Sequence, residues 1–329
     1  MSGLPSNCIL NKGVTGCGAT ELAIHQARPT IIAVPSIGLI QNKTPQHPEV
    51  LGIYGEGDKT AEIKNHLESS KGRIKIMVTW DSLPKACRTL QALGYDVYKE
   101  AQLMVDECHQ LMLSYDYRRE AIRGLLAEAK RFKDVVYVSA TPLAEEYRPK
   151  QLEAVKEYRI EWPEAKPTQI VTYELTDPVG MAAYVCKRLL SRNSATNYHV
   201  FLNSVEDITV LIKLASLTAA DTRVICADNT DNKIKLAGFP ISTTSDAVHK
   251  VNLYTSTAFE GFDIYDKEGY CIVVSDAAKD HTLLDVAVLQ QIAGRLRDSR
   301  YKDTVAHFYS RKSVPVASAA QFQAQTKAD

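Results

Sequence analysis

The stretch Cys8-Ile9-Leu10-Asn11-Lys12-Gly13-Val14-Thr15-Gly16-Cys17-Gly18-Ala19-Thr20 decides the fold of this chain. A short apolar run is followed by a glycine-rich loop and then by a helical pattern over residues 19–27. Glycines let successive backbone N–H groups turn inward, and with the N-terminus of the following helix these groups form a cradle for an anion. The stretch therefore predicts a strand, a phosphate-binding loop and a helix.

The loop matches the pattern G-x-x-x-x-G-K-[ST] at every position but one. Gly13 and Gly18 occupy the glycine positions, and Thr20 occupies the hydroxyl position that ligates Mg²⁺. Ala19 replaces the lysine that normally brings a positive charge to the phosphates. We hypothesise that Lys12 supplies this charge from the end of the strand. A glycine-rich turn without a ligand is the alternative. The residues expected to contact a nucleotide here are Lys12, Gly13, Gly16, Cys17, Gly18, Ala19 and Thr20.

The first half of the chain alternates short apolar runs with helical patterns. The apolar runs are continuous, as in parallel sheets that are covered on both faces. This alternation predicts a doubly wound α/β domain. Strands are expected at 8–10, 30–34, 50–53, 74–79, 101–105 and 135–139, and helices at 19–27, 59–69, 82–93 and 117–132.

A charged, proline-containing stretch over 143–166 separates this half from a second α/β pattern. We expect this stretch to form a helix and a linker. Two domains are therefore predicted, at 1–148 and 168–312, with a linker at 149–167 and a flexible tail at 313–329. In the second domain, strands are expected at 169–173, 199–203, 223–227, 251–255, 270–275 and 305–309, and helices at 180–191, 206–217 and 282–297.

Composition excludes several classes of protein. The 329 residues include 39 Lys plus Arg and 39 Asp plus Glu, so the formal net charge is zero. This balance excludes a strongly basic nucleic-acid coat protein but leaves room for a motor whose basic groups lie in one groove. The seven cysteines are scattered without a C-x-x-C pair, which indicates a reducing, cytoplasmic setting. No apolar run approaches the roughly 18–20 residues of a membrane span, and no secretory signal is expected.

Two adjacent carboxylates, Asp106 and Glu107, follow the apolar run 103–105. At a strand end both can face a site at the carboxyl edge of the sheet. In nucleotide hydrolysis Asp106, with Thr20, would hold Mg²⁺, and Glu107 would orient and deprotonate the attacking water. A solvated acidic turn is the alternative. His109 follows, and we expect it to couple the site energetically or to be hydrogen-bonded in the core, rather than to bind zinc.

Three later segments also contain candidate site residues. Ser139-Ala140-Thr141 ends another strand, where the hydroxyls of Ser139 and Thr141 would bridge the two halves of a site. In the second half, the segment 257–263 follows a strand. Gln291-Ile292-Ala293-Gly294-Arg295-Leu296-Arg297 is expected on a helix, from whose end Arg295 and Arg297 would reach a γ-phosphate.

In their order and spacing, these segments resemble motifs I, II, III, V and VI of superfamily-2 helicases and translocases, the DEAD/DEAH-box type included. The resemblance covers residues 7–308, and the G-R-x-R form of the last motif is similar to that of viral helicases, which suggests phage or mobile-element relatives. It implies two tandem RecA-like P-loop domains, with mainly parallel sheets, that hydrolyse ATP with Mg²⁺ in the cleft between them. The implied catalytic residues are Glu107, Gln291, Arg295 and Arg297, and Gly261 and Asp263 would also contact the nucleotide.

The resemblance also implies partners. DNA or RNA would cross both domains at Ser36, Thr79, Ser82, Asn203 and Ser204, whose small polar groups suit phosphate contacts without sequence readout. We expect a monomer that can work with a replication or mobile-element partner protein. Two basic clusters are further candidates for contact with nucleic acid, although each is also typical of a solvated face. The first consists of Lys71, Arg73 and Lys75, and the second consists of Arg118, Arg119 and Arg123.

This chain departs from the family pattern at three points. Ala19 replaces the motif I lysine, no upstream glutamine motif is available to select adenine, and Asp298 stands at the usual last arginine position. One alternative is therefore a catalytically weak or inactive helicase-fold protein that binds nucleic acid or a partner protein. Another alternative is a P-loop enzyme of a different class, such as a nucleotide kinase, which would leave the segments around Thr141 and Arg295 unexplained.

Overall fold

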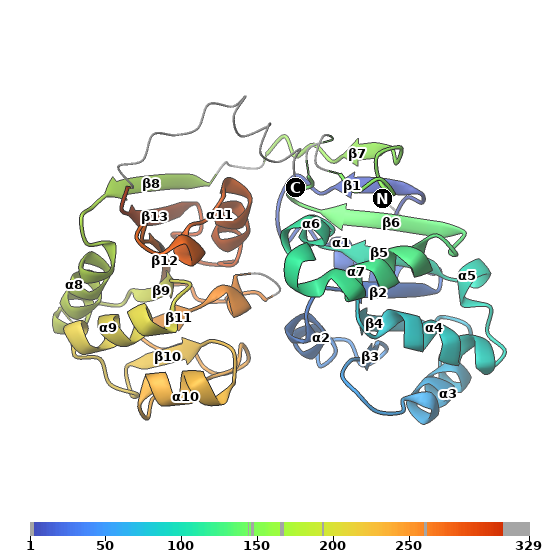
Figure 1. Ribbon diagram of the computed structural model, residues 1–329, viewed down its shortest axis with the longest axis horizontal. Helices are drawn as coiled ribbons and strands as arrows, with labels where there is room; N and C mark the ends of the chain where they lie inside the picture. The colour runs from blue at the N-terminus through green and yellow to red at the C-terminus, as the bar shows by residue number, and fades with distance from the viewer. Residues whose placement is uncertain are drawn as a thin grey trace.

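The computed structural model describes residues 3–143, 145, 148–164, 168–192, 194–259 and 262–311. Two α/β domains lie side by side, each built on one sheet (Figure 1). Every strand pair of both sheets is parallel. The predicted architecture of two tandem RecA-like domains is confirmed.

The first sheet has seven strands in the order β3-β4-β2-β5-β6-β1-β7. Its strands are β1 (Cys8–Asn11), β2 (Thr30–Val34), β3 (Leu51–Ile53), β4 (Lys75–Thr79), β5 (Gln102–Asp106), β6 (Asp134–Ser139) and β7 (Glu157–Arg159). The helices are α1 (Ala19–His25), α2 (Ile37–Lys43), α3 (Thr60–Ser69), α4 (Leu83–Ala92), α5 (Val97–Glu100), α6 (Gln110–Leu113) and α7 (Tyr115–Ala129).

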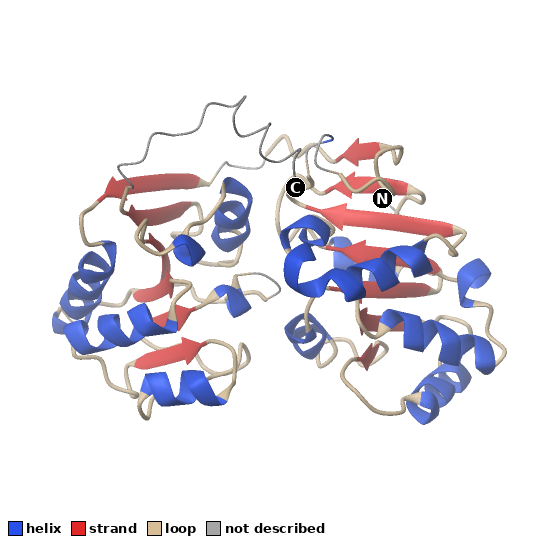
Figure 2. Cartoon of the chain, viewed as in Figure 1, coloured by secondary structure: helices blue, strands red, loops and turns tan. Residues whose placement is uncertain are grey.

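Helices cover both faces of this sheet (Figure 2). Alternate residues of a strand point to opposite faces, so Cys8 and Leu10 pack with α1 while Ile9 joins the core on the other face. This two-sided burial explains why the strands are continuous apolar runs. The carboxyl ends of β1, β5 and β6 point toward the second domain (Figure 1).

The second sheet has six strands in the order β10-β11-β9-β12-β13-β8. Its strands are β8 (Gln169–Glu174), β9 (Asn197–Phe201), β10 (Thr222–Ile225), β11 (Val251–Tyr254), β12 (Gly269–Ser275) and β13 (Thr304–Tyr309). The helices are α8 (Pro178–Ser191), α9 (Val205–Ala215), α10 (Thr230–Leu236) and α11 (Val286–Ala293), with 3₁₀ turns η2 (Ser256–Ala258) and η3 (Asp280–Thr282).

The helix expected within 143–166 is wrong for the described part of that stretch. Instead, β7 forms there and pairs with β1, so the first sheet takes a strand from the expected linker. The backbone N–H of Ile9 donates to Lys156, and that of Ile160 donates to Asn11. These bonds pair the exposed edge of β1, and this tertiary pairing outweighs the local helical pattern.

The helix expected over 282–297 is also too long. The helix α11 ends at Ala293, so Arg295 and Arg297 follow the helix instead of lying on it. The chain turns because residues after Gly294 pair with the segment around Ile264: Ile264 N–H donates to Arg295, and Arg297 N–H donates to Ile264. The expected tail over 313–329 lies outside the described residues. In the described part of the chain, no helix is both long and apolar enough to cross a membrane.

Candidate functional site

The glycine-rich loop between β1 and α1 has the backbone shape that its sequence demands. Gly13, Gly16 and Gly18 have φ angles of 70°, 67° and 87°, a region that other residues rarely adopt. Ala19 starts α1 and is buried. It therefore presents no charge to the loop, as the sequence indicated.

Lys12 places a positive charge beside this loop. Its ammonium is buried, 3.4 Å from Glu107 Oε1 and 3.6 Å from Asp106 Oδ1. Burial alone would lower the pKa of Lys12, but the charges of Glu107 and Asp106 outweigh it and raise the pKa above its ordinary value. Lys12 is therefore charged at neutral pH and faces the two carboxylates that follow β5.

The two carboxylates have different surroundings. Asp106 Oδ2 accepts a hydrogen bond of 3.0 Å from Thr20 Oγ1, and Oδ1 accepts one of 3.0 Å from the backbone of Glu107. Burial raises the pKa of Asp106 against the opposing charge of Lys12. Glu107 has a φ of 50°, a strained conformation for this residue type, and its buried Oε2 has no hydrogen-bond partner. This free oxygen lies 3.6 Å from Nδ1 of His109.

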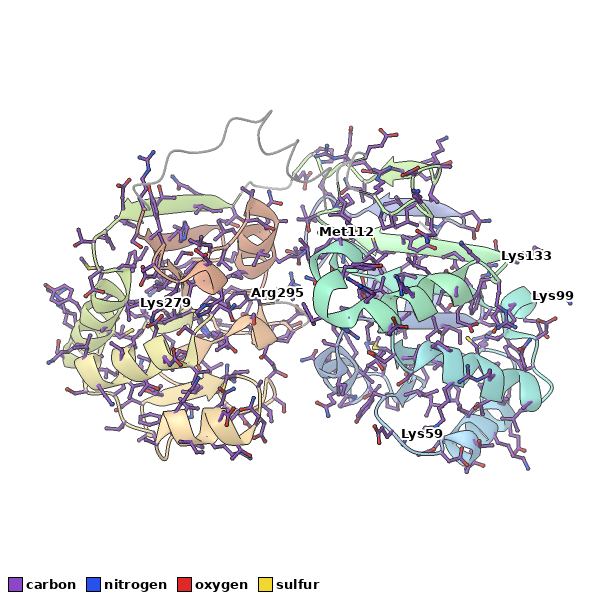
Figure 3. The ribbon with its side chains drawn as sticks, in the orientation of Figure 1. Lys59, Lys99, Met112, Lys133, Lys279 and Arg295 are labelled. Carbon is purple, nitrogen blue, oxygen red and sulfur yellow. The ribbon has the colours of Figure 1, made fainter. Side chains whose placement is uncertain are left out.

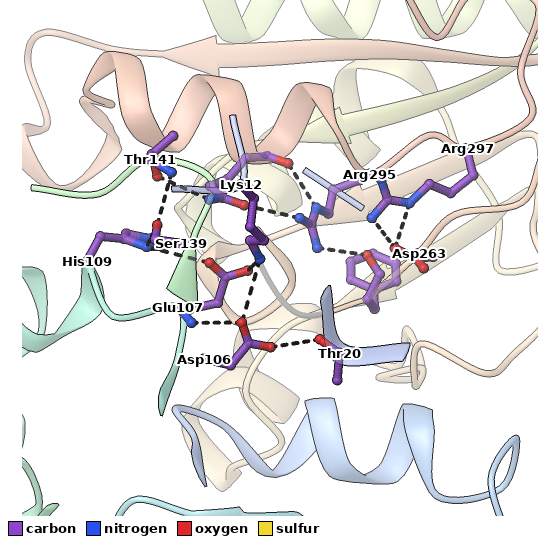
Figure 4. A network of polar contacts seen from close by, with 12 residues as sticks. Lys12, Thr20, Asp106, Glu107, His109, Ser139, Thr141, Asp263, Arg295 and Arg297 are labelled. Atoms are coloured by element: carbon purple, nitrogen blue, oxygen red, sulfur yellow. Dashed lines mark hydrogen bonds and ion pairs between the residues drawn. The ribbon is translucent and has the colours of Figure 1, made fainter. Parts of the chain in front are cut away.

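Hydrogen bonds connect this site to the second domain (Figure 4). His109 Nδ1 lies 2.9 Å from Ser139 Oγ, which accepts a bond from the backbone N–H of Thr141. Across the interface, Gln291 Nε2 donates to Thr141 Oγ1 at 3.2 Å, and Arg295 donates to Gln291 Oε1 at 3.2 Å. A series of polar contacts thus runs from the acidic pair to the segment that follows α11.

The two arginines of that segment have different partners. Arg295 is buried and donates to backbone carbonyls of Gln291 and Phe262, and it lies on the side of its domain that faces the first domain (Figure 3). Arg297 donates two hydrogen bonds to Asp263 Oδ1, at 2.7 and 2.5 Å. A Cβ atom at Gly16 would overlap the guanidinium of Arg297. The bare backbone of Gly16 therefore lets Arg297 reach the loop.

A cavity of about 860 Å³ opens beside the loop, between the domains. It is lined by Gly13 and Thr15, by Thr141, by Trp162 after β7 and by Gly294. The indole Nε1 of Trp162 donates to the backbone carbonyl of Lys12 at 2.7 Å, and the side chain is 41% exposed. Sequence reasoning missed Trp162 because it lies in the expected linker. The signal was an apolar aromatic residue between prolines in a charged stretch.

The residues expected to contact nucleic acid lie away from this network, after strand ends. In the first domain, Ser36 precedes α2 and is exposed, while Thr79 Oγ1 donates to Ser82 Oγ at 3.0 Å just before α4. In the second domain, Ser204 is buried and caps α9, and Asn203 bonds backbone groups of His281 and Ser256.

One basic candidate is wrong as a phosphate contact. Lys75 is buried, and its ammonium donates to the backbone carbonyls of Ala23, Gln26 and Arg28. It therefore joins β4 to α1 and to the segment that follows α1, inside the domain. Burial lowers the pKa of Lys75 to about 8.

The structure brings most of the predicted nucleotide-site residues into one cluster. Cys17 lies half-buried in the loop, and burial raises the pKa of its thiol, which keeps it neutral. Gly261 lies outside the described residues. The residues gathered at the loop and the interface are Lys12, Gly13, Gly16, Cys17, Gly18, Ala19, Thr20, Asp106, Glu107, His109, Ser139, Thr141, Asp263, Gln291, Arg295 and Arg297.

No protein-family model and no curated protein matches this chain. Solved structures of helicases do match its fold. Dbp5 from S. cerevisiae, bound to RNA and ADP BeF₃, is 16% identical with a TM-score of 0.58, covering 98% of this chain and 82% of that one. The DEAD-box helicase Mss116, bound to ssRNA and UDP-BeF, is 13% identical with a TM-score of 0.59, covering 92% and 66%.

RecG bound to a three-way DNA junction is a third similar structure. It is 15% identical with a TM-score of 0.53, and the match covers 98% of this chain and 42% of RecG. At such identities the likeness is one of fold. The chain has the tandem RecA-like fold that these three structures share.

Proposed function

We propose that this protein is a nucleic-acid-stimulated ATPase of the helicase or translocase type. The observation that carries the proposal is the buried Lys12 ammonium, held against Asp106 and Glu107 beside the glycine-rich loop. Burial of a lysine between two carboxylates has a desolvation cost, and charged groups buried in this way are concentrated at functional sites. In this proposal Lys12 does the work of the lysine that Ala19 replaces.

The residues of the loop fit a nucleotide and its metal ion. The Gly13–Gly18 backbone and the start of α1 would cradle the phosphates, because their N–H groups gather at a helix N-terminus. Thr20 and Asp106, now 3.0 Å apart, would hold Mg²⁺. A bound Mg²⁺ ion neutralises phosphate charge. The hydroxyl and carboxylate oxygens of Thr20 and Asp106 are the ligand types that this ion prefers.

Glu107 would act as the base. Its Oε2 has no hydrogen-bond partner, so it is available to accept a proton from the attacking water, and Oε1 is held by Lys12. Arg297, oriented by Asp263, would stabilise the charge that develops on the transferred phosphoryl group. Arg295 is bound to backbone carbonyls, and we assign it the role of holding Gln291 toward Thr141.

Trp162 would form the nucleobase site. Its exposed indole lines the cavity and is fixed to the carbonyl of Lys12. Stacking of a base on such a ring contributes about 0.5–1.5 kcal/mol, so Trp162→Ala should raise KM for ATP about three- to tenfold. Trp162→Phe keeps a ring and should stay close to the wild type. Equal KM values for Trp162→Ala and the wild type would exclude stacking on this residue.

Nucleic acid would contact the ends of β2 and β4, where the exposed Ser36 and the pair Thr79 and Ser82 lie. The similar structures of Dbp5 and Mss116 were solved with RNA and that of RecG with DNA, which supports either polymer as a partner. Arg118 lies beside this edge, where it pairs with Asp81 and with the carbonyl of Pro35. The hydrogen bond between Gln291 and Thr141 joins the two domains. Opening and closing of the domains at this contact would couple ATP hydrolysis to nucleic-acid binding at the ends of β2 and β4.

The decisive experiment measures ATP hydrolysis with and without single-stranded RNA and DNA. Turnover that rises with nucleic acid and is lost in Glu107→Gln would support the proposal. The substitution keeps the size of the side chain and removes the base, so turnover should fall at least about 100-fold. No turnover with any polymer would favour the alternative of a helicase-fold binding module, for which Ala19 is the supporting observation.

A further inference from the structure

A group of metal-ligating side chains lies on α1 and beside it, and none of its members belongs to the proposed nucleotide site. Glu21 and His25 stand one turn apart on α1, and His47 comes from the turn after α2. Among the described residues, these three form a group whose ligand atoms all lie within 4.8 Å of one another. His47 is buried, whereas Glu21 and His25 are accessible.

Two of the ligand-atom distances are close to those of a metal centre. His47 Nε2 is 3.2 Å from both carboxylate oxygens of Glu21, and His25 Nε2 is 3.6 Å from Oε2. With metal–ligand bonds of about 2.0–2.1 Å, two ligand atoms of a tetrahedral zinc ion are about 3.3 Å apart. The two pairs that include Glu21 are therefore close to the spacing that zinc requires, and the His25 and His47 nitrogens lie within 4.8 Å of each other. Rotation of the accessible His25 side chain would bring the third pair closer.

Two neighbours complete the arrangement. The carboxylate of Glu49 lies 3.6 Å from Nδ1 of His47, on the opposite side of the ring from Glu21. Metal-binding histidines commonly present their second nitrogen to a carboxylate, which fixes the ring and leaves Nε2 for the metal. Lys43 donates to Glu21 Oε1 at 2.8 Å, which holds that carboxylate and leaves Oε2 toward the histidines.

We propose that Glu21, His25 and His47 bind a divalent transition metal ion, with zinc as the preferred ion. Two imidazoles and one carboxylate are a ligand set that zinc uses in proteins, with water in the fourth position. Because Glu21 directly follows Thr20, the ion would tie the helix of the glycine-rich loop to the turn that precedes β3. This proposal does not depend on the proposed ATPase activity.

Zinc binding to the metal-free full-length protein is the test. We expect one equivalent to bind with saturation and to raise Tm, since a ligand of the folded state stabilises it. His25→Ala should bind zinc at least tenfold more weakly, and because His25 is accessible this variant should fold. Glu49→Gln should weaken binding about tenfold, as removal of such an outer partner does. His281→Ala changes an exposed histidine elsewhere and should leave affinity unchanged.

Cobalt in place of zinc identifies the ligands. Nitrogen and oxygen ligands give visible d–d bands without the strong thiolate band that any of the seven free cysteines would add. A thiolate band, or binding that survives in the His25→Ala/His47→Ala double variant, would overturn the proposal. So would a wild type without saturable zinc binding, in which case His47 serves only as a hydrogen-bond partner of Glu21.

Discussion

The two domains each bury a cluster of polar side chains, and the clusters differ in how completely they are satisfied. In the first domain Lys12, Asp106 and Glu107 meet at strand ends, at distances of 3.4 and 3.6 Å, and Glu107 Oε2 has no hydrogen-bond partner. Glu107 also has a left-handed backbone conformation. Charge and strain are concentrated at one edge of the sheet.

In the second domain the polar cluster runs across neighbouring strands, and each of its side chains has a hydrogen-bond partner; we call it the closed cluster, and the first-domain cluster the open one. Arg223 donates to Asn252 at 3.1 Å and to the hydroxyl of Tyr254 at 2.9 Å. His199 lies between that hydroxyl, at 2.8 Å, and Asp266, at 2.9 Å. These short contacts stabilise the domain, because buried polar groups with partners avoid the cost of desolvation. The comparison teaches that burial of charge alone does not identify a site, and it is the incomplete pairing of the first cluster that supports the proposed function.

The largest effect is expected where the second domain meets the open cluster. Arg297→Ala should lower the kcat of ATP hydrolysis about 1000-fold, since an arginine that stabilises the transferred phosphoryl group contributes at least that much. The matched control is Arg300→Ala, which removes an exposed arginine paired with Glu268. Steady-state kinetics measure both. If Arg297→Ala keeps turnover within threefold of the wild type, the guanidinium has only the structural role of pairing with Asp263.

A change in the closed cluster should reduce stability and spare activity. Arg223→Ala removes one buried hydrogen-bond donor from Asn252 and one from Tyr254, and it should cost about 2–4 kcal/mol of unfolding free energy. Urea unfolding measures this loss, and turnover per folded molecule should be unchanged. Glu107→Gln should show the opposite pattern. If Arg223→Ala instead abolished turnover in a folded protein, the division between the two clusters would fail.

The closed cluster also predicts a pH dependence. Burial lowers the pKa of His199 below its ordinary value despite the neighbouring Asp266. The unfolded chain therefore binds a proton that the folded state does not, at pH values below about 6.5. Stability should fall as pH drops through this value, with a slope of up to about 1.4 kcal/mol per pH unit from this group.

Unfolding measured between pH 5 and pH 8 at roughly half-unit steps tests this slope. His199→Gln removes the titrating group and should flatten the curve. A smaller slope of the same sign should remain, since burial also lowers the pKa of His66 and His307. A His199→Gln curve as steep as that of the wild type would assign the pH dependence to other groups.

The smallest effect separates two serines at helix starts. Ser204 accepts a bond from the backbone of Asp207 and caps α9, so Ser204→Ala should cost about 1 kcal/mol. Ser36 is exposed and makes no such bond at α2. Ser36→Ala should leave stability within about 0.5 kcal/mol of the wild type and weaken nucleic-acid binding. Equal losses of stability in Ser204→Ala and Ser36→Ala would show that the two serines do not differ as helix caps.

Local sequence predicted most of the fold because both faces of each sheet are covered. That burial produces continuous apolar runs such as Thr30–Val34, where the predicted and observed strands coincide. The strand β7 could not be predicted, since its three residues are charged or exposed and pair only because β1 offers an open edge. The helix α11 was predicted too long because its end depends on pairing with Ile264, far away in sequence.

The sequence predicted the parts of the candidate site whose residues lie close together along the chain. Lys12 was the nearest cation to the position of Ala19, and the structure places it against both carboxylates. The pairing of Arg297 with Asp263 and the packing of Trp162 on the loop could not be predicted, since both join segments that are distant in sequence. The close approach of Arg297 gives a second reason for glycine at position 16, besides its positive φ angle.

The most direct test of the central claim is the affinity of Lys12→Ala for ATP, measured with a fluorescent nucleotide. Loss of the ammonium should raise Kd at least about 100-fold, or about 2.7 kcal/mol. Lys12→Met keeps the bulk of the side chain and should show the same loss, and the exposed Lys133→Ala should show none. If folded Lys12→Met binds ATP as tightly as the wild type, Lys12 does not replace the missing lysine and the account is wrong.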